Sequence, residues 1–198
     1  MLEVIALNKT IHRLEIFKDY NALIEHQRCC IFGENGLGKT TLLCIIAGLE
    51  SYQSGEFTLS SMPLDKPLEC IAIASDAITY PPFLSAQEVI LLNQRQFTCK
   101  AADALIKGFS LNEHLHKPIS ALSSGNIKKV QLCCALMRKA KLYLLDEPSA
   151  YLDTQSIKFL FEALENAVGQ VIVTSNEPEL FAKHGFVTQH LHGLAKSK

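Results

Sequence analysis

Four short runs of apolar residues divide the chain, and none of them alternates with polar residues. The runs are Arg28–Phe32, Cys70–Ala74, Lys141–Asp146 and Gln170–Thr174. A strand that is apolar at nearly every position is buried on both faces, which is typical of parallel sheets covered by helices. Segments with helical spacing alternate with these runs along the chain. The pattern predicts an α/β fold with a mostly parallel sheet flanked by helices.

Three helices are predicted from the spacing of apolar residues. Thr40–Ala47 follows the first buried strand and stops at Gly48. Thr154–Val168 is amphipathic, with apolar residues at helical intervals. In Asn126–Met137 the apolar residues are offset by three, seven and ten positions, which predicts one buried face. These residues are Ile127, Val130, Cys134 and Met137.

Two parts of the chain do not follow the alternation of buried strands and helices. Leu2–Leu7 and Ile11–Phe17 read as short strands that form an antiparallel edge, and Glu56–Leu59 reads as a further strand. Residues 76–120 contain proline breaks and several short helical stretches, with a helix start at Ser85–Glu88. We therefore expect a single domain over residues 1–198, with a small helical subdomain at residues 76–120 inserted in it.

Composition, net charge and cysteine spacing limit the classes of protein to which the chain can belong. The chain has 198 residues, of which 48% are hydrophobic and 20% charged, as expected for a globular domain with a substantial core. The net charge of −1 provides no broad positive field, so no nucleic-acid partner is expected. No apolar run reaches the roughly 20 residues that a membrane span requires, and the N-terminus does not resemble a signal peptide. Seven cysteines without C-x-x-C spacing indicate reduced core thiols rather than a metal site.

The most informative stretch is residues 33–41, which lie between an apolar strand and a predicted helix. It matches the pattern G-x-x-x-x-G-K-[ST] and predicts a phosphate-binding loop, in which glycines let successive N–H groups face a phosphate chain. Lys39 is expected to reach the β- and γ-phosphates, and the Thr40 hydroxyl is expected to bind Mg²⁺. The loop residues expected to bind nucleotide are Gly33, Glu34, Asn35, Gly36, Leu37, Gly38, Lys39, Thr40 and Thr41.

A second set of candidate residues follows the third buried strand, in the sequence LYLLDEP at 142–148. Asp146 and Glu147 stand where this strand leaves the sheet. Behind a phosphate loop, Asp146 is expected to hold Mg²⁺ through water, and Glu147 is expected to polarise the water that attacks the γ-phosphate. Acidic caps at a strand-to-helix turn would give the same composition, so the pairing with the phosphate loop decides the interpretation.

The sequence LSSGN at 122–126 precedes a predicted helix. Ser123 and the backbone of Gly125 can bind an anion at such a helix start, although an ordinary helix cap has the same composition. Taken in order, GENGLGKTT, LSSGN, LYLLDEP and SAYLD resemble the ATP-binding subunit of ABC transporters, over nearly the whole chain. The resemblance implies a P-loop NTPase fold with ATP and Mg²⁺ at the site. It also implies that LSSGN is the signature sequence, usually LSGGQ.

The resemblance also implies partners. Members of this family pair head to tail, so that the phosphate loop of one subunit and the signature of the other enclose each ATP. A second nucleotide-binding subunit is therefore expected, most simply a second copy in a twofold dimer, with residues Ser149–Asp153 crossing between subunits. An integral membrane subunit is expected to dock on the helical insertion, which implies a peripheral position at the cytoplasmic face of the inner membrane.

Several positions depart from the family pattern. Asp76 stands where a metal-contacting glutamine is expected, although a shifted alignment is an alternative there. Asn176 replaces a histidine that touches the γ-phosphate, and asparagine cannot become a cation. The signature has Ser124 and Asn126 in place of glycine and glutamine, and only His12 is available to stack on adenine. These departures predict retained nucleotide binding with slow hydrolysis.

Two functions remain open from the sequence. The first is an ATPase that powers an ABC transporter, and the short chain, compact insertion and Glu177-Pro178 most resemble the haem exporter of cytochrome c maturation. The second is a nucleotide-sensing or structural subunit whose ATP-driven dimerisation matters more than turnover, which Asp76 and Asn176 favour and an intact Glu147 disfavours. ABC proteins of DNA repair or translation need long coiled coils or tandem ATPase units, and the sequence contains neither.

Overall fold

The computed structural model describes residues 1–99 and 101–191. The end of the predicted 1–198 domain, residues 192–198, and residue 100 within the predicted subdomain lie outside the described residues. The strands are β1 (Leu2–Ile11), β2 (Leu14–Ile24), β3 (Arg28–Phe32), β4 (Ser54–Leu59), β5 (Met62–Pro63), β6 (Ile71–Ala74), β7 (Leu142–Asp146), β8 (Gln170–Thr174) and β9 (Val187–His190). The α-helices are α1 (Lys39–Ile46), α2 (Pro67–Cys70), α3 (Ala86–Gln96), α4 (Asp103–Gly108), α5 (Ser124–Leu136), α6 (Thr154–Glu165) and α7 (Pro178–Ala182).

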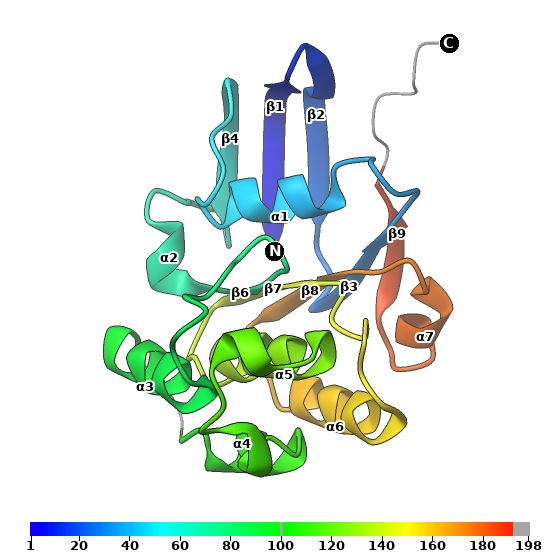
Figure 1. The fold of residues 1–198 in the computed structure, drawn as a ribbon. Coiled ribbons are helices and arrows are strands. Elements are labelled where there is room, and N and C mark those ends of the chain that lie inside the picture. The colour runs from blue at the N-terminus through cyan, green and yellow to red at the C-terminus, as the bar shows by residue number, and fades with distance from the viewer. Residues whose placement is uncertain (100, 192–198) are drawn as a thin grey trace.

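Two sheets organise the molecule (Figure 1). The strands of the larger sheet are all parallel, in the order β6-β7-β8-β3-β9. The smaller sheet has the order β2-β1-β4-β5 and is antiparallel. The predicted α/β class is confirmed, and so are the bounds of β3 and β8. The antiparallel strands form a sheet of their own, rather than an edge of the parallel sheet.

The parallel strands are buried on both faces because their side chains alternate between two hydrophobic cores. In β7, Leu142 and Leu144 lie in the core shared with α1 and the antiparallel sheet. Tyr143 and Leu145 lie in the core shared with α5 and α6. Each fully buried side chain of this kind contributes roughly 1.5–3 kcal/mol of transfer free energy. A strand in the middle of the parallel sheet therefore needs apolar side chains on both of its faces.

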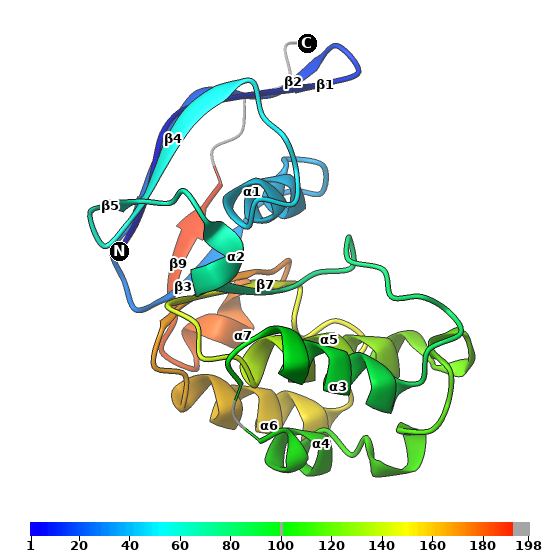
Figure 2. The same cartoon turned by 90° about the vertical axis from the view of Figure 1, so that its left-hand side faces the viewer.

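Helix α1 lies between the two sheets (Figures 1 and 2). Leu42, Leu43, Ile45 and Ile46 are all buried, so the helix is enclosed on more than one side. The antiparallel sheet thus covers α1 and fixes it against the parallel sheet. The loop that precedes α1 is held in place by this packing.

The prediction of a single buried face on the helix over residues 126–137 is wrong. In α5, Val130, Leu132, Cys133, Cys134 and Ala135 are all buried. Polar residues of the same helix are buried with them: Lys128, Lys129 and Gln131. The reason is that α5 packs on β6 and β7 of the parallel sheet and also contacts α3, which lies beside it, and α4 (Figures 1 and 2). From its second turn onward the helix is therefore enclosed on several sides.

The segment over residues 76–120 packs onto α5 rather than around a core of its own. Helix α3 begins at the predicted position, with Ser85 and Glu88 forming a capping box. Of the short helical stretches predicted in this segment, the one at Asn112–His114 is only a 3-10 helix. Val89 and Ile90 of α3 belong to the same hydrophobic cluster as α5 and α6. Within residues 1–99 and 101–191, no helix is both long and apolar enough to cross a membrane.

Candidate functional site

The phosphate loop connects β3 to α1, as the sequence predicts. Gly36 and Gly38 have φ angles of 86° and 96°, which residues with a Cβ rarely adopt. A Cβ on Gly38 would lie 2.6 Å from Cγ2 of Ile16, so β2 of the antiparallel sheet touches the loop directly. No side chain caps the start of α1. The loop therefore has the curled backbone and the open helix start that bind phosphate groups.

Lys39 is the cation of this loop, and it is buried, with only 7% of the residue exposed. Its Nζ donates hydrogen bonds to the carbonyl oxygen of Gly33 at 2.6 Å and to that of Glu34 at 3.3 Å. It also donates to Oδ1 of Asn176 at 2.9 Å. The ammonium group thus lies inside the loop and links it to the segment after β8.

Asp146 ends β7 and is almost fully buried. Its Oδ1 accepts a hydrogen bond from the Thr174 hydroxyl at 2.6 Å, and its Oδ2 accepts one from the Ser75 hydroxyl at 2.8 Å. These hydroxyls come from the ends of the neighbouring strands β8 and β6. Hydrogen bonds to both oxygens hold the carboxylate in one orientation. The hydroxyls of Thr174 and Ser75 therefore position the Asp146 carboxylate at the edge of the sheet where the strands end.

Glu147 follows Asp146 in a left-handed conformation, with a φ of 45°. Its N–H donates to both oxygens of Thr174, each at 3.1 Å. Its Oε2 accepts a hydrogen bond from the Asn176 N–H at 3.2 Å. Burial raises the pKa of the Glu147 carboxyl, whereas the Asn176 N–H and the nearby Lys39 oppose this shift. A carboxylate with a raised pKa is better suited to accept a proton from water.

Three predicted residues are therefore in contact. Asn176 bonds to Lys39 through its side chain and to Glu147 through its backbone. The contact joins the loop before α1, the turn after β7 and the turn after β8. Because the carboxyl ends of parallel strands lie along one edge of a sheet, groups separated by more than a hundred residues meet there.

The residues predicted to bind Mg²⁺ are Thr40, Asp76 and Asp146, and both aspartates have partners within the protein. Within the described residues there is no cluster of three or more His, Cys, Asp or Glu side chains that would hold a metal unaided. Asp146 already accepts two hydrogen bonds, and Asp76 is paired with Lys128 at 2.7 Å. Magnesium commonly takes most of its ligands from phosphate oxygens and water, with one or two protein groups. Thr40 and Asp146 fit that mode of binding.

Ser123 and Gly125 lie at the start of α5, away from the phosphate loop. Ser123 is the N-cap and accepts a hydrogen bond from the Asn126 N–H at 3.3 Å. A cavity of about 350 Å³ at this helix start is lined by Ser124, Tyr151 and Asp76, among others. A separate hollow of about 600 Å³ is lined by Gly33, Glu34 and Asn35 of the loop. Ser124, which stands between these two residues, and the phosphate loop thus line different hollows of one chain.

Close contact with the loop Ser149–Asp153, which follows β7, explains why a glycine stands at position 125. A Cβ there would lie 2.5 Å from the carbonyl oxygen of Tyr151, which has a φ of 63°. The loop Ser149–Asp153 is then anchored by Asp153, which caps α6 and pairs with Lys129 at 2.7 Å. Lys129 and the N–H of Ser156 hold the pKa of the Asp153 carboxyl well below its usual range. The close contact between Gly125 and Tyr151 therefore joins the LSSGN sequence to the anchored loop Ser149–Asp153.

We expect Gly125→Ala to destabilise the protein by about 1–3 kcal/mol, because the added methyl group would overpack the contact with the Tyr151 carbonyl. Urea unfolding measures the difference in the free energy of unfolding. Ser124→Ala, one position earlier in the same helix, is the control and is expected to change stability by less than about 0.5 kcal/mol. Equal stability of Gly125→Ala and the parent chain would contradict this contact.

Reasoning from sequence missed three residues that contact the site: Ser75, Thr174 and Lys128. A signal existed for Ser75 and Thr174, because each stands at the end of a predicted buried strand, level with Asp146. Thr174 pairs directly with Asp146 in the register of β7 and β8. Lys128 gave no such signal, since a lysine in a helix is normally exposed.

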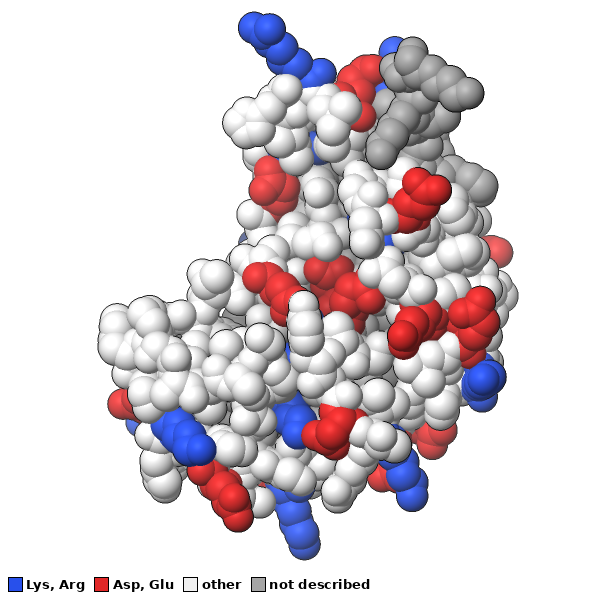
Figure 3. Space-filling model, turned by 45° about the vertical axis from the view of Figure 1, so that its right-hand side comes forward, with Lys and Arg blue, Asp and Glu red and all other residues white. Residues whose placement is uncertain are grey.

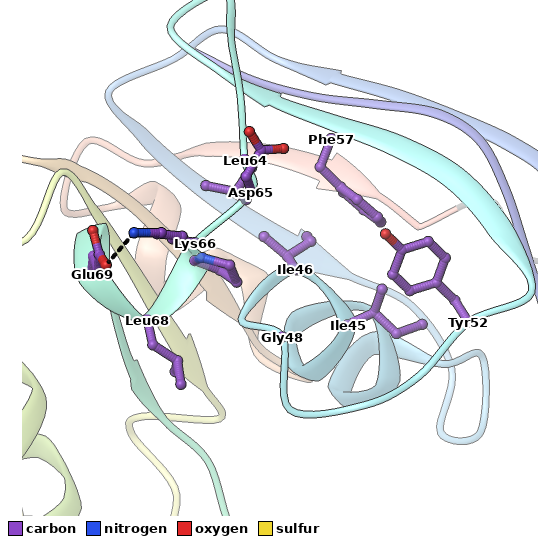
Figure 4. Close-up of a pocket in the computed structure, with 11 residues that line it drawn as sticks. Ile45, Ile46, Gly48, Tyr52, Phe57, Leu64, Asp65, Lys66, Leu68 and Glu69 are labelled. Atoms are coloured by element: carbon purple, nitrogen blue, oxygen red, sulfur yellow. Dashed lines mark ion pairs between the residues drawn. The ribbon is translucent and has the colours of Figure 1, made fainter.

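A further cavity lies at the opposite end of α1 from the phosphate loop (Figure 4). It has a volume of about 500 Å³ and is lined by Ile45 and Ile46 of α1 and by Tyr52 and Phe57, among others. None of its lining residues was predicted to bind nucleotide. At about 500 Å³, it is smaller than the hollow of about 600 Å³ beside the phosphate loop.

Charge is unevenly placed on the surface. Figure 3 shows acidic side chains gathered across the middle of one face, between the antiparallel strands above and the helices below. Lysine and arginine side chains lie mainly at the two ends of this view. An anionic nucleotide would therefore depend on local donors of the loop rather than on a broad positive surface.

Comparison with known proteins agrees with this geometry. The sequence profile of the family described as ABC transporter matches residues 20–150, well over half of the chain. The chain belongs to the ABC transporter family. Its relatives identify it as an ATP-binding subunit that powers a transporter, and as an ATPase.

Individual relatives show how broad this similarity is. The cytochrome c biogenesis ATP-binding export protein CcmA of Legionella pneumophila is 32% identical, over 80% of this chain and 84% of CcmA. The Fe(3+) ions import ATP-binding protein FbpC 2 of Pectobacterium atrosepticum is 31% identical, over 90% of this chain and 57% of that protein. The ATP-binding cassette MJ0796, solved as a dimer bound to ADP and Pi, superimposes with a TM-score of 0.81. It is 20% identical, over 96% of this chain and 94% of its own, and confirms the fold.

Proposed function

We propose that this ABC subunit hydrolyses ATP at a site formed by Lys39, Glu147 and Asn176 and completed by a second nucleotide-binding subunit. The observation that carries the proposal is the contact of these three residues at one edge of the parallel sheet. Each comes from a different segment of the chain, and each has a group suited to phosphoryl transfer.

The chemistry of each residue follows from its surroundings. Glu147 accepts a proton from the attacking water, and its raised pKa favours that transfer. Lys39 exchanges its bonds to loop carbonyls for the β- and γ-phosphate oxygens, which neutralises charge where it develops. Asn176 donates a neutral hydrogen bond from its amide to the γ-phosphate. When bound at Thr40 and Asp146, Mg²⁺ supplies additional charge neutralisation to the phosphates.

A second subunit is part of the proposal because the start of α5, at Ser124, and the phosphate loop line different hollows of one chain. In a twofold head-to-tail dimer, Ser123 and Gly125 of one subunit face the phosphate loop of the other. A second copy of this chain is the simplest partner. The exposed Tyr151 in the Ser149–Asp153 loop is available to cross between subunits.

We further propose that the subunit sits at the cytoplasmic face of the inner membrane, bound to an integral membrane subunit through the segment over residues 76–120. Large apolar side chains are exposed there: Phe83, Leu91 and Leu92, with Phe83 at 78% exposure. Exposed apolar groups on one segment favour contact with another protein. Residues 76–120 would then be the subdomain for docking within a single ATP-binding domain spanning 1–198. Purification of the tagged chain from membranes should recover a polytopic protein, and recovery of none would contradict this part.

Haem export for cytochrome c maturation is the specific transport function that we propose. It is supported by the similarity to CcmA, by the compact insertion and by Glu177-Pro178 after Asn176. The relative named for Fe(3+) import supports a different cargo at nearly the same identity. Disruption of the gene separates the two: loss of c-type cytochromes supports haem export, and loss of iron uptake alone overturns it.

A sensing or structural subunit is the second candidate. It is favoured by Asn176 in place of a histidine and by the pairing of Asp76 with Lys128. Steady-state hydrolysis of ATP, measured with and without the membrane partner, distinguishes these functions. Turnover that the partner stimulates supports the transport ATPase, and binding without turnover in both conditions supports the sensor.

Asn176→His is expected to raise kcat for ATP hydrolysis on the order of tenfold, because a histidine can carry positive charge beside the γ-phosphate. Steady-state phosphate release measures this change. Asn166→His, at the exposed end of α6, introduces the same side chain away from the site and is expected to leave kcat unchanged. A kcat that Asn176→His leaves unaltered would show that this position does not limit hydrolysis.

A further inference from the structure

The backbone at Glu147 is in an unfavourable conformation. Its φ of 45° lies in the left-handed region, which is uncommon for a residue with a long side chain. Within the described residues, every other non-glycine position with a positive φ is exposed to solvent, whereas Glu147 is only partly exposed. A conformation of this kind persists only where the surrounding structure holds it. The contacts around Glu147 should therefore include the groups that impose it.

The peptide that joins Asp146 to Glu147 is held at both of its polar groups. Its carbonyl oxygen accepts a hydrogen bond from Nζ of Lys128 at 3.2 Å. Its N–H donates to Oγ1 and to the carbonyl oxygen of Thr174, each at 3.1 Å. On the other side of the Glu147 Cα, the Glu147 carbonyl oxygen accepts a hydrogen bond from the Ala150 N–H at 3.1 Å. Because the peptides on both sides are held, the backbone angles of Glu147 are held with them.

Lys128 and Thr174 make these bonds in the interior of the protein. Only 1% of the Lys128 side chain is exposed, and Thr174 is fully buried. The Lys128 ammonium group also pairs with Asp76 at 2.7 Å, and the Asp76 side chain is 59% exposed. A buried ammonium group needs its partners, because leaving it unpaired in the interior is strongly unfavourable. Both contacts to the peptide are therefore shielded from exchange with water.

The orientation of this peptide decides where the Glu147 carboxylate lies. Oε2 of Glu147 accepts a hydrogen bond from the Asn176 N–H at 3.2 Å. The side chain of Asn176 in turn accepts a hydrogen bond from Lys39 of the phosphate loop at 2.9 Å. Relaxation of Glu147 to the ordinary helical region, with a φ of about −63°, would rotate its Cβ and move the carboxylate away from Asn176. The left-handed backbone thus keeps the carboxylate beside the loop.

We propose that Lys128 and Thr174 are positioning residues that clamp the Asp146–Glu147 peptide and so hold the Glu147 carboxylate at the phosphate loop. The inference rests on the proposed role of Glu147 in accepting a proton from water. Both residues act through the backbone of Glu147 rather than on the nucleotide. The clamp therefore sets the rate of hydrolysis, whereas ATP affinity depends on Lys39 and the loop backbone.

A glycine substitution detects the clamp without any nucleotide. Where the left-handed conformation is imposed, Glu147→Gly is more stable than Glu147→Ala, because glycine adopts a positive φ without steric cost. Where the backbone is free to relax, alanine is the more stable, because glycine loses more conformational freedom on folding. We expect the urea midpoint of Glu147→Gly to be the higher one in the parent chain. When Lys128→Met is added to both variants, the difference should vanish or reverse.

The matched control for this comparison is Lys129→Met. Lys129 is a buried lysine of the same helix that pairs with Asp153 instead, so its removal should preserve the order of the two midpoints. Lys128→Met is expected to fold, because methionine fills the space of the lysine and the exposed Asp76 remains solvated. If Lys128→Met does not fold, Thr174→Val, which has the same shape as the parent residue, takes its place.

Kinetics test the consequence for hydrolysis. Thr174→Val is expected to lower kcat on the order of tenfold to a hundredfold with unchanged ATP affinity, because misplacing a reacting group by about 1 Å has effects of this size. Thr174→Ser keeps the hydroxyl and should retain the rate of the parent chain. Thr58→Val is the control, since it removes a hydroxyl that bonds to Glu3 in the antiparallel sheet.

The outcomes separate the possibilities. A higher midpoint for Glu147→Gly that Lys128→Met abolishes and Lys129→Met preserves supports the clamp. A higher midpoint for Glu147→Ala in the parent chain, or the same order in all three backgrounds, overturns it. An unchanged kcat in Thr174→Val, or failure of both Lys128→Met and Thr174→Val to fold, also overturns it. If the parent chain hydrolyses no ATP, it is the proposed function that fails, and the order of the urea midpoints still tests the clamp.

Discussion

Glu147→Gln is expected to lower the rate of ATP hydrolysis by roughly 10²–10⁴-fold, the usual contribution of a positioned general base. Glutamine keeps the size and the hydrogen bond from the Asn176 N–H, but it cannot accept a proton from water. ATP affinity is expected to change little, since Lys39 and the loop backbone are untouched. Single-turnover hydrolysis and equilibrium binding of ATP measure the two effects separately.

The control for this variant is Glu15→Gln, which changes the same functional group on the exposed surface of β2. It is expected to leave hydrolysis unaltered. If Glu147→Gln hydrolyses ATP at the rate of the parent chain, another group acts as the base. Loss of ATP binding together with hydrolysis would instead show that Glu147 holds the site in shape.

The pH dependence of hydrolysis follows from the same residue. Burial raises the pKa of Glu147 above the value of about 4.3 for an exposed glutamate. The ionised form of Glu147, which accepts the proton, is therefore lost as the pH falls through the raised pKa. On the acid side of the profile, the rate should therefore fall at a higher pH than the ordinary pKa of glutamate would give. Glu147→Gln should abolish this part of the profile.

Lys39→Met is expected to weaken ATP binding on the order of 10²-fold, since hydrogen bonds to charged groups contribute about 1.5–3 kcal/mol each. The ammonium group donates two hydrogen bonds to loop carbonyls and one to Asn176, and those donors become available to the β- and γ-phosphates. Methionine keeps the length of the side chain and removes the charge. Isothermal calorimetry with a non-hydrolysable ATP analogue measures the affinity.

Lys66→Met removes an equal charge from an exposed position before α2 and serves as the control. It is expected to bind ATP like the parent chain. Comparable affinity of Lys39→Met and the parent chain would contradict the assignment of Lys39 to the phosphates. A similar loss in both variants would indicate a general effect of net charge instead.

The central sheet could be predicted from the sequence because burial on both faces leaves a direct mark. The bounds of β3 and β8 agree with the predicted runs, since the three central residues of each strand alternate between the two cores. Helix α1 was also located, because it follows a glycine loop and stops at Gly48. Patterns that arise from local geometry and full burial can be read without a structure.

Helix α5 could not be described correctly for the opposite reason. The apolar spacing over residues 126–137 predicts one buried face, but the helix packs against the sheet and against α3 and α4. Lys128 is buried there because it pairs with Asp76, 52 positions earlier, which is a property of the tertiary structure. Sequence spacing carries no information about such a partner.

The short helices α2 and α7 were missed although a signal was present. Each has a proline in its first turn, Pro67 and Pro178, followed by an acidic residue two or one positions later. Proline at this position and acidic residues in the first turn both favour a helix start. Lengths of four and five residues made these segments read as loops.

The mass of the Glu147→Gln variant in solution tests most directly the claim that two subunits complete each ATP site. Slow hydrolysis keeps ATP bound, so light scattering with Mg²⁺ and saturating ATP should give twice the 21.9 kDa of one chain. Without nucleotide, the same variant should be a monomer. A monomer at saturating ATP, for protein shown to bind ATP, would contradict a site shared between two copies of this chain.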